Sequence, residues 1–229
     1  MSVGTSATVA ARYNAESPTC GIAEAVASLP PTGGVVHVPA GEYSLRATVH
    51  LPSGVRLAGD GVATVLSIAP IQQVALGGDV DGGARVVELA AGHAFRSGDA
   101  IGLRDETNAG WWGTHTTVSR VEGSLVHVDD PVTRALSTEA GARAVNLFPA
   151  VQANDATDVE MADLTIRGPD GYAGAWWDFT YSAVHLVGCR RTRVQNVTVS
   201  GWPSDGISVQ RGSDAQVTGC QAHGNSGHG

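Results

Sequence analysis

A pattern of 19 residues is written three times near the C-terminal end of the chain, at 150–168, 183–201 and 206–224. When the copies are aligned, apolar or small residues fall at the same positions, and a glycine closes each copy. One such row contains Val151, Val184 and Ile207. A single copy cannot bury its apolar face alone, whereas stacked copies pair their strands in parallel and share one core. The repeat therefore predicts a solenoid.

The spacing of the copies favours one kind of solenoid. They begin 33 and 23 residues apart (183 − 150 and 206 − 183). An offset of roughly two dozen residues suits one coil of a right-handed parallel β-helix, an all-β fold. The ten extra residues of the first offset predict a loop that carries Trp176, Trp177 and Asp178. An antiparallel β-sandwich would also explain short strands, but it does not explain three equal copies in register.

The sequence pattern of the N-terminal part indicates the start of the same solenoid. Residues 21–29 place apolar side chains at helical spacing, and Pro30 and Pro31 end that pattern. This helix would cap the first coil, because an exposed solenoid end invites aggregation. Residues 33–61 then alternate in short period-2 pairs separated by glycine, proline or serine, which indicates short strands. We expect the cap and the first coils within residues 1–83.

The middle of the chain has a different character. Residues 84–135 resemble a small antiparallel module, with a hairpin tip at Glu122-Gly123 or Gly123-Ser124. We therefore predict an antiparallel insertion at 84–135 and further coils at 136–229. Because residue 229 falls where the next coil would begin, we also expect additional coils beyond it.

Composition restricts the classes of function. The net charge is −8 with only 16% charged residues, which argues against a nucleic-acid-binding protein. All 14 basic residues are arginines, so a lysine base or Schiff base is excluded. The apolar runs are too short to cross a membrane, and the N-terminus lacks the pattern of a signal peptide. Cys20, Cys189 and Cys220 are few and far apart, which predicts free thiols and no metal site.

Two segments carry a family resemblance. TGGVVHVPAGEYSLRATVHLPSGVRLAGDG (32–61) resembles the opening of pectate-lyase-superfamily β-helix proteins, in which a short helix precedes a Gly-Gly coil with a Pro-x-Gly-x-Tyr ending. DGISVQ (205–210) and GCQAHGNSGHG (219–229) resemble bacterial right-handed β-helix repeat proteins. The superfamily includes polysaccharide lyases, glycoside hydrolases, epimerases and phage tailspikes, so the resemblance specifies a fold more than an activity. It implies a polysaccharide partner, a monomer or a homotrimer, and action outside the cell or at its surface.

A narrower resemblance concerns one possible active site. Polygalacturonase-like hydrolases carry an aspartate pair that is followed about one coil later by Gly-His-Gly. Here Ser204-Asp205-Gly206 precedes Gly227-His228-Gly229 by 23 residues, but serine stands where the first aspartate would be. The same period places Ser182, Asp205 and His228 in one column, at about 4.8 Å per coil. Asp205 and His228 could then act as base and acid, or all three could be corner residues.

Other candidates follow from position. Asp178 and Asp205 could flank a glycosidic bond at roughly 5–10 Å, as hydrolysis requires. Trp176, Trp177 and Trp202 could stack on sugar rings. His185 and Gln210 should point outward from their strands, beside the bound chain. Trp111-Trp112 is more consistent with packing against a neighbouring coil.

Two functions remain open at this stage. The first is a polysaccharide lyase or glycoside hydrolase; the resemblance implies that a lyase would hold Ca²⁺ on aspartates, and its base would be Arg211, Arg190 or a histidine such as His228. The second is a non-catalytic surface, tailspike-like or carbohydrate-binding module. Convergent carboxylates in a tryptophan-walled cleft would favour the enzyme, and a smooth outward face would favour the binding module.

Overall fold

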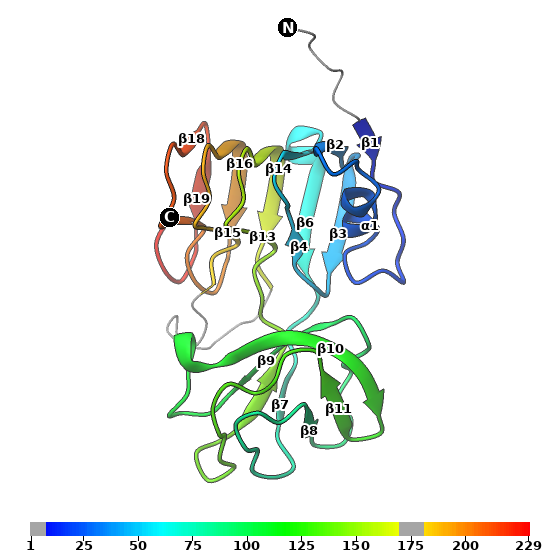
Figure 1. The fold of residues 1–229 in the computed structure, drawn as a ribbon, viewed down its shortest axis with the longest axis vertical. Coiled ribbons are helices and arrows are strands. Elements are labelled where there is room, and N and C mark those ends of the chain that lie inside the picture. Colours follow the sequence, from blue (N-terminus) through cyan, green and yellow to red (C-terminus); the bar gives the residue numbers. More distant parts are fainter. Residues whose placement is uncertain (1–7, 170–180) are drawn as a thin grey trace, which may run out of the picture.

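The computed structural model describes residues 8–169 and 181–229, and in this part of the chain the secondary structure is almost entirely β. Figure 1 shows two bodies, with parallel strands above and an antiparallel sheet below. We call them the parallel-sheet unit and the antiparallel unit. The chain leaves the parallel-sheet unit after Ile68 and re-enters it at Val151. Among the described residues, no helix is long and apolar enough to span a bilayer.

The parallel-sheet unit contains two sheets, one of nine strands and one of four. The nine strands are β1 (Thr8–Ala10), β2 (Gly34–His37), β3 (Gly41–Leu45), β5 (Val55–Ala58), β6 (Thr64–Ile68), β14 (Glu160–Arg167), β16 (Arg193–Ser200), β18 (Gln216–Thr218) and β19 (Gln221–His223). The four strands, in spatial order, are β4 (Val49–His50), β13 (Val151–Asn154), β15 (Val184–Val187) and β17 (Ile207–Gln210). Every pairing within these sheets is parallel.

The register predicted from the repeat is confirmed. Val151 pairs with Val184, and Val184 pairs with Ile207. Two further rows of the aligned copies also pair across all three: Met161 with Val194 and Val217, and Ile166 with Val199 and Ala222. Side chains alternate across a strand, so these apolar rows point to one side. In the first two copies they lie in one hydrophobic core, whereas Val217 of the third copy is 51% exposed. Identical positions in successive copies therefore stack, as a solenoid requires.

The corners between strands repeat as well. Asp163, Asn196 and Gly219 occupy equivalent corners, and all three have a left-handed backbone with φ between +51° and +66°. Aspartate, asparagine and glycine are the residues that tolerate this conformation best. The Asn196 amide also donates a 2.9 Å hydrogen bond to Asp163 Oδ1 in the neighbouring copy. At another repeated corner, Arg191 makes two hydrogen bonds with the Asp158 carboxylate.

The helix and the short strands predicted in the N-terminal part are present. Helix α1 (Ile22–Ala27) buries Ile22 and Val26, although it is shorter than the predicted 21–29. The alternating apolar residues of 33–61 are all buried, namely Val36, Val38, Tyr43, Leu45, Val49, Leu51, Val55 and Leu57. All three cysteines are free thiols, as expected, and Cys20 and Cys189 are buried.

The antiparallel unit is one six-stranded sheet with its own hydrophobic core. Its strands are β7 (Gln73–Ala75), β8 (Val86–Glu88), β9 (Ala100–Arg104), β10 (Thr114–Glu122), β11 (Leu125–Val128) and β12 (Arg143–Val145). Glu122 pairs with Leu125, so Gly123-Ser124 forms the hairpin tip. The sheet also includes β7 and β12, which lie before and after the insertion predicted at 84–135. The antiparallel unit therefore extends beyond those predicted bounds on both sides. Between the strands, the described residues also form two short 3-10 turns, η1 (Gly61–Ala63) and η2 (Gly110–Trp112).

Candidate functional site

A cleft of about 370 Å³ lies between the two units. One wall is the outward face of β4 and β13 of the four-stranded parallel sheet, and β9 and β10 of the antiparallel unit form another. Leu147, Phe148 and Pro149, on the segment that returns from β12 to β13, also line it. A concave site with a few convergent polar groups between two structural units is the usual setting for ligand binding.

The parallel wall presents a row of polar side chains. The strand register aligns His50, Gln152, His185 and Ser208 across β4, β13, β15 and β17. We call this the polar row. The preceding residues in these strands are apolar core positions, so the polar row points outward. His50 and Gln152 line the cleft, together with Asn154 two residues further along β13.

The antiparallel wall contributes hydroxyls, an imidazole and a carboxylate. His115, Thr116 and Thr117 of β10 line the cleft, and so does Asp130, which follows β11. The Asp130 backbone N–H donates a 2.8 Å hydrogen bond to the Thr116 hydroxyl, which donates in turn to Asp130 Oδ2 at 3.3 Å. These reciprocal contacts hold the carboxylate at the side of the cleft.

Tyr181 connects the two walls. Its ring meets the ring of His115 edge-on, with centroids 4.6 Å apart, and meets His185 in the same way at 5.0 Å. The Tyr181 carbonyl accepts a 2.9 Å hydrogen bond from Trp202 Nε1, which anchors the residue to the parallel-sheet unit. Burial raises the pKa of the Tyr181 phenol, so the neutral phenol is favoured at physiological pH.

The histidines of the cleft are held in their neutral form. The pKa of His115 is lowered to about 4, mainly by desolvation; a hydrogen bond with the Leu147 backbone opposes the shift, and the positive charge of Arg104 adds to it. His50 keeps contact with solvent, but the walls remove part of its hydration, and this desolvation lowers its pKa. At neutral pH the cleft therefore has imidazoles that can donate or accept hydrogen bonds without carrying charge.

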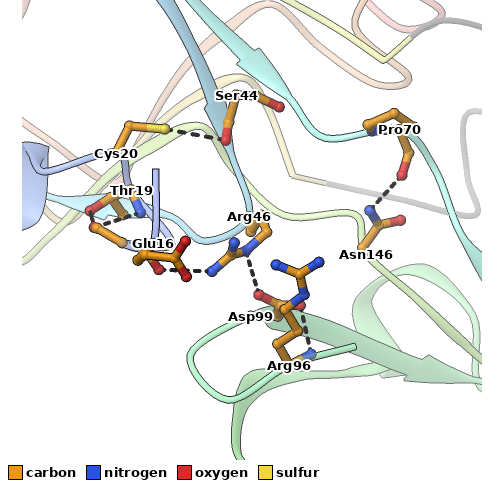
Figure 2. A network of polar contacts seen from close by, with 10 residues as sticks. Glu16, Thr19, Cys20, Ser44, Arg46, Pro70, Arg96, Asp99 and Asn146 are labelled. Atoms are coloured by element: carbon orange, nitrogen blue, oxygen red, sulfur yellow. Dashed lines mark hydrogen bonds and ion pairs between the residues drawn. The ribbon is translucent and has the colours of Figure 1, made fainter. Parts of the chain in front are cut away.

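A network of polar contacts joins the parallel-sheet unit to the antiparallel unit, and we call this network the joint (Figure 2). Arg46, which follows β3, places its Nε 2.8 Å from Asp99 Oδ1. Asp99 Oδ2 accepts a 2.8 Å hydrogen bond from the Arg96 backbone, and Ala100 N donates to the Arg46 carbonyl at 2.7 Å. The Asp99 side chain is only 6% exposed, so this ion pair is largely shielded from solvent. Arg46 also donates to the Glu16 carbonyl, at 3.2 Å.

Asn146 ties together the two segments that connect the units. Its side-chain amide donates to the Pro70 carbonyl at 3.0 Å and accepts from the Gln72 backbone N–H at 2.7 Å (the first bond is drawn in Figure 2). Pro70 and Gln72 lie on the segment that leaves the parallel-sheet unit, and Asn146 lies on the segment that returns to it. One buried amide therefore bridges both connections.

The predicted pairing of Asp205 and His228 is confirmed. Asp205 Oδ1 lies 3.1 Å from His228 Nδ1 and also accepts a 2.7 Å hydrogen bond from the His228 backbone N–H. Ser182 and Asp205 each lie two residues before a paired position, Val184 and Ile207, so they are equivalent positions of neighbouring copies, as predicted. The Ser182 hydroxyl is buried and makes no hydrogen bond to any described residue. His228 is 85% exposed, so the pair lies at the surface near the last strands of the stack.

Two predicted ligand contacts are wrong. Trp202 is fully buried in the core of the parallel-sheet unit, held by its bond to Tyr181 and by a bond from its backbone N–H to Asn225. A buried indole cannot stack on a sugar ring. His185 does point outward in the polar row, but it is only 3% exposed because it packs against Tyr181. Burial lowers the pKa of His185, and the charge of Asp205 partly opposes that shift.

The remaining candidates are dispersed. Gln210 donates a 3.0 Å hydrogen bond to Ser208 within β17. Arg211 is exposed and lies at the opposite end of that strand from Asp205. Trp176, Trp177 and Asp178 lie outside the described residues, and so does the predicted separation of Asp178 from Asp205.

The expectation that Trp111 and Trp112 pack against a neighbouring coil is not met in the described part of the chain. Both lie in η2 of the antiparallel unit, where they are 64% and 56% exposed. The Arg134 guanidinium lies 4.0 Å above the Trp112 ring in a cation–π contact. Among the described residues, no group of three or more histidine, cysteine, aspartate or glutamate side chains is arranged to hold a metal ion.

Sequence reasoning missed the residues that form the cleft, chiefly His50, His115, Asp130 and Tyr181. A partial signal exists for His50, which follows Val49 just as Gln152 follows Val151. His50 and Gln152 pair in the sheet although they are 102 positions apart (152 − 50), with the antiparallel unit between them in the sequence. No local repeat period could therefore predict this pairing. His115 and Asp130 lie outside the repeat altogether.

No protein-family model matches the sequence, and no curated protein sequence matches it either. Among solved structures, the tailspike of Pseudomonas phage phi297 is similar over 87% of this chain and 41% of its own, at 16% identity and a TM-score of 0.34. The tailspike of Acinetobacter baumannii bacteriophage AP22, solved with a capsular saccharide, aligns over 83% of this chain and 40% of its own, at 11% identity and a TM-score of 0.32. The chain thus spans about two fifths of the length of these tailspikes. A Parabacteroides merdae protein, provisionally assigned as a glycosyl hydrolase, aligns over 96% of both chains at 11% identity and a TM-score of 0.45.

Proposed function

We propose that this chain is a carbohydrate-active protein that binds a saccharide in the cleft between its two units. The observation that carries the proposal is the cleft itself, which sets His50 and Gln152 of the polar row against the hydroxyls and imidazole of β10. We further propose that the stacked parallel strands wind as a right-handed parallel β-helix, because right-handed crossovers are the strong rule for parallel strands.

The chemistry of the walls suits sugar hydroxyls. A sugar hydroxyl both donates and accepts hydrogen bonds, and so do the neutral imidazoles of His50 and His115 and the amide of Gln152. The half-buried Tyr181 ring supplies apolar surface for the C–H face of a sugar ring. Specific sites combine such apolar surface with a small number of placed polar groups.

Binding can be tested with a glycan array and matched alanine variants. We expect Gln152→Ala to weaken saccharide binding by roughly tenfold, because a site built to hydrogen-bond a ligand loses affinity when a partner is removed. Ser208→Ala is the matched control, since Ser208 belongs to the same polar row but does not line the cleft. Equal losses in both variants, or binding that neither variant changes, would place the saccharide elsewhere.

A catalytic function is the second candidate, and the contact between Asp205 and His228 favours it. A carboxylate beside an imidazole can move a proton during hydrolysis or elimination of a glycosidic bond. The test is to incubate the protein with neutral and acidic polysaccharides, with and without a chelator of Ca²⁺, and to follow reducing ends and the absorbance of unsaturated products. Asp205→Asn should abolish any activity found; unchanged activity would leave the pair as a structural corner.

A further inference from the structure

We infer that the cleft selects saccharides without carboxylate groups, namely neutral or amino sugars, and discriminates against uronic acids. The inference rests on the proposed saccharide-binding function and deepens it. It follows from the distribution of charge on the walls. Asp130 provides one carboxylate, and no arginine or lysine is found among the described residues that line the cleft.

The histidines do not replace the missing cation. His50 and His115 are the histidines that line the cleft, and desolvation lowers the pKa of both, so at pH 7 they are predominantly neutral. The neighbouring phenol of Tyr181 is neutral as well, because burial raises its pKa. At neutral pH the described walls therefore carry a single negative charge.

Arg104 is the cation whose charge acts on His115. It lies at the end of β9, is only 6% exposed, and is already engaged by other groups of the protein. Its side chain does not line the cleft. In the sequence, residues 170–180 contain two aspartates and no arginine, lysine or histidine, so this segment contributes no basic side chain.

The dimensions of the cleft make this charge effective. A cleft of about 370 Å³ keeps a bound group within roughly 10 Å of Asp130, about one Debye length at 0.1 M salt. A uronate would therefore place its carboxylate near a like charge with no facing cation, in a partly desolvated site. A neutral sugar avoids this repulsion, and an amino sugar gains an attraction to Asp130.

The test compares glycans in matched pairs that differ only in charge, such as an α-1,4-galacturonate tetramer and its full methyl ester, within an array of neutral, amino and acidic glycans. We expect the wild-type chain to bind the uncharged member at least about fivefold more tightly at pH 7 and low salt. Thr117→Arg, which adds a cation to the cleft wall, should remove or reverse this preference. Ser119→Arg adds the same charge on the same strand at an exposed position outside the cleft, so it should leave the preference unchanged.

The possible outcomes distinguish a failure of this inference from a failure of the proposed saccharide-binding function. Binding of uronates as tight as that of their uncharged partners would overturn the inference and leave the binding function standing. No binding to any glycan would overturn both. If Thr117→Arg does not fold, Asn154→Arg places the same charge at an exposed position on the opposite wall, and a retained preference for uncharged glycans in that variant would also overturn the inference.

Discussion

The parallel-sheet unit and the antiparallel unit build their cores in different ways. In the parallel-sheet unit a core position recurs in the next copy, so Val151, Val184 and Ile207 form one row. In the antiparallel unit, Leu103 and Val126 share a core but occupy unrelated positions in the sequence. The cleft takes one wall from each unit. The repeat therefore predicts that Gln152 faces outward on one wall, but it carries no information about His50 or about the wall from the antiparallel unit.

If the two cores are independent, cavities in them should have local effects. Leu164→Ala in β14 and Leu103→Ala in β9 each remove a side chain that is at most 1% exposed, and each should cost about 4 kcal/mol in the stability of its own unit. Hydrogen exchange should accelerate mainly in the unit that carries the substitution, because separate cores open as separate cooperative units. If either change accelerates exchange equally in both units, the two cores behave as one.

The joint is where the two units should depend on each other. Asp99→Asn removes the charge that faces Arg46 in a shielded position, and we expect a loss of about 3 kcal/mol in chemical denaturation. Glu122→Gln is a suitable control, because it breaks the exposed Arg120 pair and should cost less than about 1 kcal/mol. Similar losses from both substitutions would mean that the joint is no stronger than a surface contact.

The interface between the units should also respond to pH. His115 has a folded-state pKa of about 4, below its ordinary value of 6.5, so the unfolded chain binds a proton more readily. Stability from this group is therefore complete above pH 6.5 and falls as the pH drops towards 4, by on the order of 3 kcal/mol. His115→Gln should flatten the dependence in that window, whereas His223→Gln, at an exposed position, should not. An unchanged slope in His115→Gln would assign the acid sensitivity to other groups.

The smallest expected effect is at the connection between the units. Asn146→Ala leaves the Pro70 carbonyl and the Gln72 N–H without their partner, which should cost about 2 kcal/mol. The exposed Asn154→Ala should change stability by less than about 0.5 kcal/mol. Thermal unfolding of the two variants measures the difference. A result near zero for Asn146→Ala would show that water replaces the amide without loss.

Much of the parallel-sheet unit could be predicted from the sequence by itself. Parallel pairing in a solenoid places equal positions side by side, so a local period is enough to predict the strand rows. The same period predicted the contact between Asp205 and His228, which are 23 residues apart. The short strands of residues 33–61 and the hairpin tip at Gly123-Ser124 were also predictable, because turn residues and period-2 alternation are local signals.

The tertiary structure alone decided which of the outward residues form a site. His115 and Tyr181 meet although they are 66 residues apart (181 − 115) and belong to different units, and no periodicity links them. Trp202 looked like a surface residue beside a corner, but contacts with Tyr181 and Asn225 bury it. A repeat encodes which backbones run side by side; it does not encode how an inserted unit folds back over one face, because the packing of two separate cores depends on contacts that are distant in sequence.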